Sequence, residues 1–173
     1  ADAGLIGLPN AGKSSLLNAL TESRAKVGNY QFTTLDPNLG ALPGGYILAD
    51  LPGLIEGAAS GKGLGHKFLK HVKRTKVIFH LISLENEDVV SIYKGIRKEL
   101  EDFGNGLTEK KEVIILSKSD LASREVIDSA RKALEKLNPN ILEVSVIDDV
   151  AVKKLSDEIT RIIADSSSVD SSS

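Results

Sequence analysis

The sequence contains no cysteine, no methionine and no tryptophan, and no apolar run approaches the ~20 residues that cross a bilayer. The absence of cysteine excludes a disulfide framework and thiolate metal ligands, and it fits a reducing compartment. No signal peptide is visible in the sequence. We therefore expect a protein that has no membrane partner and lies in the cytoplasm, with an organelle as the alternative.

The length and composition describe one ordinary globular domain. The chain has 173 residues, of which 41% are hydrophobic and 27% charged, and this is enough for a full core. The chain opens as ADAGLIG without a methionine, so we expect a processed or excised domain. We assign this domain to residues 1–164 and interpret the serine-rich residues 165–173 as a flexible tail.

Apolar runs alternate with amphipathic stretches along most of the chain. Strands are predicted over residues 3–8, 46–51, 76–83, 112–117 and 141–145, and helices over residues 13–20, 64–75, 88–103, 123–137 and 150–164. This alternation predicts an α/β fold with a mostly parallel sheet that is covered by helices on both faces. Two glycine-rich segments, residues 21–45 and 52–65, break the rhythm and are typical of functional loops.

The segment GLPNAGKS, residues 7–14, matches the phosphate-binding pattern G-x-x-x-x-G-K-[ST] between a predicted strand and a predicted helix. Gly7 and Gly12 allow the backbone N–H groups to surround phosphate oxygens. Lys13 adds a cation for the β- and γ-phosphates, and Ser14 offers a hydroxyl to Mg²⁺. The pattern predicts binding of a nucleoside triphosphate and leaves the base open.

The segment LSKSDL, residues 116–121, follows a predicted strand where GTPases carry Asn-Lys-x-Asp. The Asp120 carboxylate can accept hydrogen bonds from N1–H and the 2-amino group of guanine, whereas adenine offers neither donor. The stem of Lys118 can cover the base plane. Ser117 replaces the usual asparagine, so we expect weaker binding of the base with the same preference. An ATPase is therefore a distant alternative.

Four segments in a fixed order carry a resemblance to a known family. The phosphate loop, YQFTTLDPNLG, DLPGLIEGA and GLGHKFLKH follow one another, and the chain closely resembles the Obg family of GTPases from residue 2 to about residue 164. The resemblance implies a Ras-like P-loop GTPase domain with a six-stranded sheet, in which one strand is antiparallel. The chain departs from the family pattern at Gln31, Ser117 and Val146.

The resemblance also implies a set of site residues. Mg²⁺ would be held by Ser14, Thr34 and Asp50, and the Gly53 N–H would sense the γ-phosphate, so that loss of this phosphate releases both glycine-rich loops. A backbone N–H of the segment EVSVID would meet the guanine O6. The expected nucleotide-binding residues are Asn10, Ala11, Gly12, Lys13, Ser14, Ser15, Phe32, Thr34, Asp50, Gly53, Ser117, Lys118, Asp120, Leu121, Ser145, Val146 and Ile147.

If this chain hydrolyses a nucleotide, a group other than a glutamine must orient the attacking water. Leu54 stands where Ras-type enzymes carry the glutamine that orients water, and leucine has no donor or acceptor. The chain resembles GTPases that pair an asparagine of the phosphate loop, here Asn10, with a bound K⁺; the alternative is that Asn10 only braces the loop. We expect Lys13, Thr34, Gly53 and Asn10 to act in slow hydrolysis.

The resemblance implies that the chain binds GTP and GDP, and in addition the alarmone ppGpp, during assembly of the large ribosomal subunit. The alternative function is a guanine-nucleotide sensor that hardly hydrolyses GTP and works by binding a partner. Residues 58–83 contain no acidic residue and carry six basic ones, which indicates either a solvated face or a surface for rRNA. We expect a monomer, and we interpret His80 as a hydrogen-bonded core residue.

Overall fold

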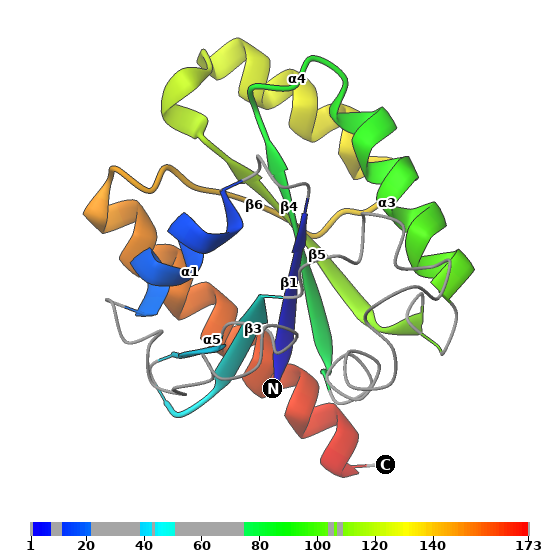
Figure 1. Ribbon diagram of the computed structural model, residues 1–173, viewed down its shortest axis with the longest axis vertical. Coiled ribbons are helices and arrows are strands. Elements are labelled where there is room, and N and C mark those ends of the chain that lie inside the picture. The colour runs from blue at the N-terminus through cyan, green and yellow to red at the C-terminus, as the bar shows by residue number, and fades with distance from the viewer. Residues whose placement is uncertain are drawn as a thin grey trace, which may run out of the picture.

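The computed structural model describes residues 2–7, 12–21, 39–42, 44–50, 75–103, 106 and 109–172. Within these residues six strands form one sheet in the order β2-β3-β1-β4-β5-β6 (Figure 1). All neighbouring strands are parallel except β2 and β3, which are antiparallel. The predicted six-stranded, mostly parallel sheet is therefore confirmed. Its strands are β1 (Ala3–Gly7), β2 (Leu39–Ala41), β3 (Ile47–Asp50), β4 (Val77–Ser83), β5 (Lys111–Ser117) and β6 (Ile141–Glu143).

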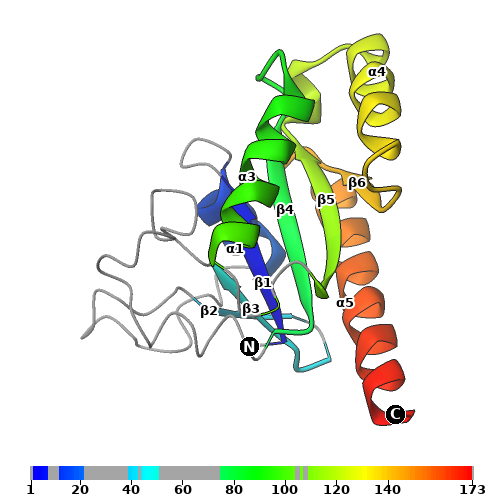
Figure 2. The same cartoon turned by 90° about the vertical axis from the view of Figure 1, so that its right-hand side faces the viewer.

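Helices cover both faces of the sheet, as the alternating pattern predicts (Figures 1 and 2). Helices α1 and α5 pack together on one face, and α3 and α4 pack together on the other. The helix predicted over residues 64–75 falls almost entirely outside the described residues. The described helices are α1 (Lys13–Thr21), α3 (Val89–Phe103), α4 (Arg124–Glu135) and α5 (Asp149–Ser172), together with the short 3₁₀ helix η6 (Ser119–Leu121).

The central strands are buried along their length because helices cover both of their sides. Alternate side chains of a strand point to opposite faces, so each strand supplies two cores. Phe79 and Ile115 belong to the core beneath α1 and α5. Ile82 and Ile114 belong to the core beneath α3 and α4. A continuous apolar run in the sequence is thus the signature of a strand at the centre of this sheet.

Two elements differ from the sequence prediction. Strand β2 was not predicted, because its three residues lie at the end of a glycine- and proline-rich stretch and carry no readable alternation. The last helix was predicted to end at Ala164, whereas α5 continues to Ser172. Once a helix exists, each added residue gains a hydrogen bond, and no glycine or proline stops it here. The domain boundary at residue 164 stays a prediction.

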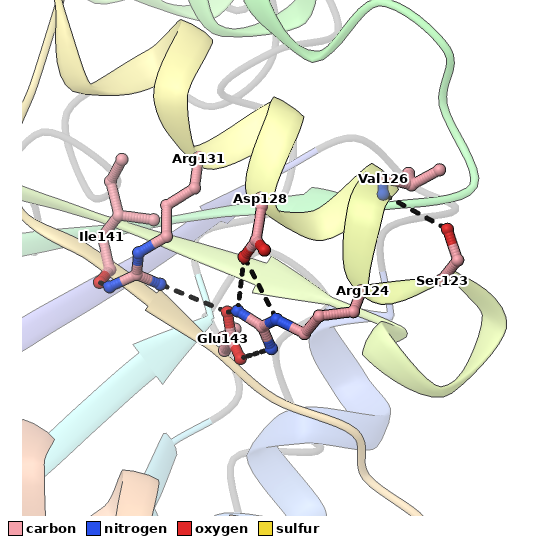
Figure 3. Close-up of polar contacts among 7 residues, drawn as sticks. All are labelled: Ser123, Arg124, Val126, Asp128, Arg131, Ile141 and Glu143. Atoms are coloured by element: carbon pink, nitrogen blue, oxygen red, sulfur yellow. Dashed lines mark hydrogen bonds and ion pairs between the residues drawn. The ribbon is translucent and has the colours of Figure 1, made fainter.

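A group of alternating charges joins α4 to the edge strand β6 (Figure 3). Arg124 contacts Asp128 at 2.8 Å and Glu143 at 2.8 Å. Arg131 lies 3.3 Å from the same Glu143 carboxylate and donates a 2.8 Å hydrogen bond to the backbone carbonyl of Ile141. The pKa of Arg124 is raised by its hydrogen bonds to Glu143 and Asp128. These contacts fix α4 against the outer edge of the sheet.

His80 is buried in β4 as predicted, but the prediction that it is hydrogen-bonded is wrong. Neither ring nitrogen has a hydrogen-bond partner among the described residues, and the ring stacks on Tyr93 with centroids 5.3 Å apart. Its Nδ1 lies 3.9 Å from Glu112 Oε2, a carboxylate oxygen that also lies 3.6 Å from the Arg97 guanidinium. Burial, reinforced by the positive charge of Arg97, lowers the pKa of His80 to about 3. The ring is neutral in the folded protein at neutral pH.

We expect acid to destabilise the fold through His80. In the unfolded chain a histidine binds a proton below pH ~6.5, whereas native His80 does not do so until about pH 3. Stability is therefore lost as the pH falls through this window, by about 2 kcal/mol between pH 7 and pH 5. Urea unfolding of the wild type and His80→Phe at both pH values measures the difference. The Phe variant should lose about 2 kcal/mol less than the wild type, and an equal loss would contradict the assignment.

Candidate functional site

Five parallel strands end at the same edge of the sheet, and the predicted site residues follow these ends. In open α/β sheets this edge is where ligands bind. The last residues of β1, β3 and β5 are Gly7, Asp50 and Ser117. The N-terminus of α1 and the loop after β6 lie beyond the same edge. The sheet therefore brings together segments that are far apart in the sequence.

The phosphate side of the site begins at the N-terminus of α1. Gly12 has a φ of 91°, which a residue with a side chain rarely adopts, and its carbonyl accepts the first helical hydrogen bond from Leu16 N at 2.9 Å. Ser14 and Ser15 lie in the first turn of α1, where backbone N–H groups have no partner within the helix. This is a suitable arrangement for a phosphate.

Several predicted residues of this region fall on the part of the chain that is not described. Asn10, Ala11, Phe32, Thr34 and Gly53 lie outside the described residues. Their proposed contacts with nucleotide, Mg²⁺ and K⁺ stay predictions.

Lys13 and Asp50 form the charged centre of the phosphate side. The Lys13 ammonium lies 3.3 Å from Asp50 Oδ1, and the two side chains are only 11% and 6% exposed. The same Oδ1 atom is buried and receives no hydrogen bond of good geometry from the residues that the structure describes. The pair comes from the start of α1 and the end of β3, so the structure places two of the predicted site residues in contact. Their roles toward phosphate and Mg²⁺ stay predictions.

The residues present are compatible with Mg²⁺. The buried Asp50 oxygen, which has no hydrogen bond within the described part of the chain, can accept one from a metal-bound water. Among the described residues no three His, Cys, Asp or Glu side chains gather into a metal cluster. Such a cluster is not required, since Mg²⁺ in nucleotide sites is held by one or two side chains together with phosphate oxygens and waters.

Lys118 connects the base side of the site to the phosphate side. Its backbone is left-handed, with φ 59° and ψ 40°, which costs a lysine about 1–2 kcal/mol. Its stem passes close to Gly12, where an added Cβ would lie 4.0 Å from Lys118 Cε. Its ammonium pairs with the Glu85 carboxylate. The stem thus lies close to Gly12 at the start of α1, and its predicted role of covering a base stays a prediction.

Asp120 and Ser145 bring two loops together. Ser145 Oγ donates a 2.8 Å hydrogen bond to Asp120 Oδ1, and Ser119 N donates to the Val144 carbonyl at 3.2 Å. The bond leaves Asp120 Oδ2 and the second lone pair of Oδ1 for a ligand. Asp120 itself is exposed. The carboxylate is therefore oriented by a neighbouring loop while it faces solvent.

The remaining base-side residues lie around this pair. Ser117 is buried at the end of β5. Leu121, Val146 and Ile147 are apolar and exposed, and Ile147 is 75% exposed. They border Asp120 on the two loops that Ser145 joins. The structure therefore brings the two predicted segments together, and the contacts of their residues with a base stay predictions.

Sequence reasoning missed two contributions. Glu85 pairs with Lys118, and its backbone N–H is held by Ser83 Oγ at 3.1 Å. The sequence feature that could have indicated Glu85 is its position just after β4, because β4 pairs with β5, the strand that precedes Lys118. Ser145 was predicted only as part of a segment that offers a backbone N–H, whereas its hydroxyl orients Asp120. No local pattern indicates a contact between residues that are 25 positions apart.

The structure also bears on membrane association. No helix in the described part of the chain is long and apolar enough to span a bilayer.

Comparison with known proteins gives one family and a consistent set of relatives. A family model described as 50S ribosome-binding GTPase matches residues 2–118. GTPase Obg of Picosynechococcus sp. is 45% identical over 94% of this chain and 48% of its own length. GTPase Obg of Erythrobacter litoralis is 41% identical over 98% of this chain and 49% of its own length. The chain spans about half the length of the curated relatives it matches, and the predicted resemblance to the Obg family is confirmed.

Solved structures show the same fold at low sequence identity. A GTP-binding protein from Sulfolobus solfataricus in complex with GDP matches with a TM-score of 0.67 and 16% identity over 94% of this chain and 52% of that protein. Apo elongation factor SelB from Methanococcus maripaludis matches with a TM-score of 0.62 and 16% identity over 94% of this chain and 33% of that protein. The P-loop GTPase fold is thus confirmed, and the chain belongs to the family of 50S ribosome-binding GTPases.

Proposed function

We propose that this chain binds GTP together with Mg²⁺ and hydrolyses it slowly, as a switch that acts on the large ribosomal subunit. The observation that carries the proposal is the geometry of one sheet edge. It holds a buried Lys13–Asp50 pair at the start of α1 and an Asp120 carboxylate oriented by Ser145. The Lys13–Asp50 pair suits the phosphates, and the Asp120 carboxylate suits guanine. The two ends of one nucleotide would therefore be bound by separate groups of residues.

The residues divide the work by their chemistry. Gly12 and the first turn of α1 direct backbone N–H groups toward the phosphates, and Lys13 neutralises charge that develops on the β- and γ-phosphates. Asp120 accepts from N1–H and the 2-amino group of guanine, while Lys118 covers the base. Asp50 and Ser14 would hold a bound Mg²⁺, which would supply positive charge to neutralise the phosphates.

The switch and the hydrolysis step involve residues outside the described part. In this proposal Thr34 and Gly53 respond to the γ-phosphate, and both loops are released when it leaves. Leu54 cannot orient water, so Asn10 would hold a K⁺ that supplies the added positive charge at the phosphates. The alternative is a sensor of GTP, GDP and ppGpp that hardly hydrolyses GTP, and the nature of Leu54 favours it.

The ribosomal part of the proposal is supported by the family description and by the curated relatives named GTPase Obg. Clustered lysine and arginine between residues 62 and 76 would suit rRNA phosphates. We place this activity in the cytoplasm, with the GTPase domain as a monomer.

Single-turnover hydrolysis tests the proposal. With excess protein, GTP and Mg²⁺ fixed, cleavage should be slow in Na⁺ and at least ~10-fold faster in K⁺, because an added cation stabilises the transition state. Asn10→Ala should abolish the K⁺ effect, while Asn18→Ala, an exposed position of α1, should keep it. Tight GTP binding without cleavage in either salt would favour the sensor.

A further inference from the structure

A groove lies between the start of α3 and the start of α4. Its volume is about 540 Å³, within the ~300–1,000 Å³ of known ligand pockets. The groove is apolar at its base, where side chains of the β4–α3 turn, α3 and α4 meet. These apolar side chains are Leu84, Val89, Val90, Val126, Ala130 and Ala133. Val126 is 49% exposed, so an apolar wall faces solvent.

Helix α4 exposes this wall because its two sides have different partners. Its N-terminus is fixed by Ser123, whose hydroxyl accepts from Val126 N at 3.2 Å. Residues 124, 128 and 131 lie on one side and pair with Glu143 of β6 and with one another (Figure 3). Residues 126, 129, 130 and 133 follow helical spacing on the side that lines the groove. The arginines of α4 are therefore engaged elsewhere.

The rim of the groove is acidic. Among the described residues that line the groove, Glu85, Glu87, Asp88 and Glu125 are carboxylates and none is lysine or arginine. Glu85 pairs with Lys118, and Asp88 caps α3 by accepting from Ser91 N at 2.9 Å. Within the described ranges Glu87 and Glu125 make no hydrogen bond or ion pair through their side chains. Two carboxylates therefore border the apolar groove without a cation from the described part of the chain.

We propose that this groove docks a cationic, amphipathic segment of a partner protein. Apolar side chains of the segment would fill the base of the groove, and its lysine or arginine residues would meet Glu87 and Glu125. A helix that presents anchors at i, i+3, i+4 and i+7 matches a groove between two helices. The carboxylate rim repels nucleic-acid phosphates, so the partner at this face is protein rather than RNA. Docking at this groove does not depend on GTP hydrolysis.

A synthetic peptide tests the proposal. The probe has leucine at i, i+3, i+4 and i+7 and lysine at its other positions, and its binding to the GDP-loaded chain is followed by fluorescence anisotropy. Val126→Ser and the double substitution E87Q/E125Q should each weaken binding at least ~fivefold, through lost apolar burial and lost charge pairing respectively. In the double variant, the peptide affinity should also depend less on the salt concentration.

Matched controls separate docking from general attraction. E135Q/D157N removes the same net charge from exposed positions outside the groove and should bind the peptide as the wild type does. A peptide of the same composition in scrambled order should bind at least ~fivefold more weakly. GDP affinity, measured separately, should be equal in all variants, so a failure of the proposed nucleotide function is seen independently.

Three results would overturn the proposal. The first is peptide affinity that is unchanged by both groove variants. The second is binding of a single-stranded RNA that Val126→Ser or E87Q/E125Q weakens, which would assign the face to nucleic acid. The third is a concentration-dependent dimer, seen by sedimentation, that Val126→Ser abolishes, which would assign the groove to a second copy of the chain.

Discussion

Replacing Asp120 with asparagine is expected to weaken GDP binding at least ~100-fold and to create a preference for xanthosine diphosphate. Guanine presents two donors, N1–H and the 2-amino group, and an amide can pair with only one of them through its oxygen. Losing a charged hydrogen bond and leaving a donor unpaired together account for about 3 kcal/mol or more. Xanthine carries an oxygen at the 2-position, which the asparagine NH₂ can donate to.

Titration calorimetry with GDP, ADP and xanthosine diphosphate measures this change of base preference. Asp128→Asn is the matched control, because Asp128 lies on α4 and pairs with Arg124 rather than with the site. That variant should keep the wild-type order of affinities. If Asp120→Asn still preferred GDP over ADP by the wild-type margin, another group would be reading the base.

Replacing Lys13 with methionine is expected to have two separate effects. Loss of the cation should weaken GTP and GDP binding ~10–100-fold, because a charged hydrogen bond to phosphate contributes about 1.5–3 kcal/mol. Without nucleotide, the variant should also unfold more easily by about 3 kcal/mol, since Asp50 is left buried without its cation. Nucleotide titration and urea unfolding of the nucleotide-free chain measure the two effects.

The double variant K13M/D50N distinguishes these effects. It removes the buried charge together with its partner, so stability without nucleotide should return toward the wild type while nucleotide affinity stays low. Lys132→Met, at an exposed position of α4, should change neither quantity. Recovery of nucleotide affinity in the double variant would mean that Lys13 only neutralises Asp50 and does not bind phosphate.

The central strands and the phosphate loop could be predicted because their signals are local. Strands β4 and β5 are runs of apolar residues buried on both faces, and a short continuous run of this kind is typical of a strand inside a parallel sheet. Gly12 was predicted from its motif. Its φ of 91° explains why the motif requires glycine at this position, since a residue with a side chain rarely adopts that conformation. Lys13 and Ser14 follow directly from the same spacing.

Contacts between distant loops could not be predicted, since nothing in a local pattern encodes them. Ser145 reaches Asp120 only because parallel strands β5 and β6 end at one edge. Glu85 reaches Lys118 because β4 pairs with β5 and Lys118 adopts a left-handed backbone. The length of α5 was also missed, because serine neither favours nor stops a helix strongly.

The arginines of α4 have a consequence for the behaviour of the protein in concentrated solution. A strand at the edge of a sheet offers unpaired backbone groups that can template aggregation with another chain. At β6 the Ile141 carbonyl already accepts from Arg131, and Arg124 and Glu143 place charges along the same three-residue strand. An incoming strand would have to displace these groups and bury their charges. The salt-bridge group thus protects solubility at this edge, a property on which selection can act separately from nucleotide chemistry.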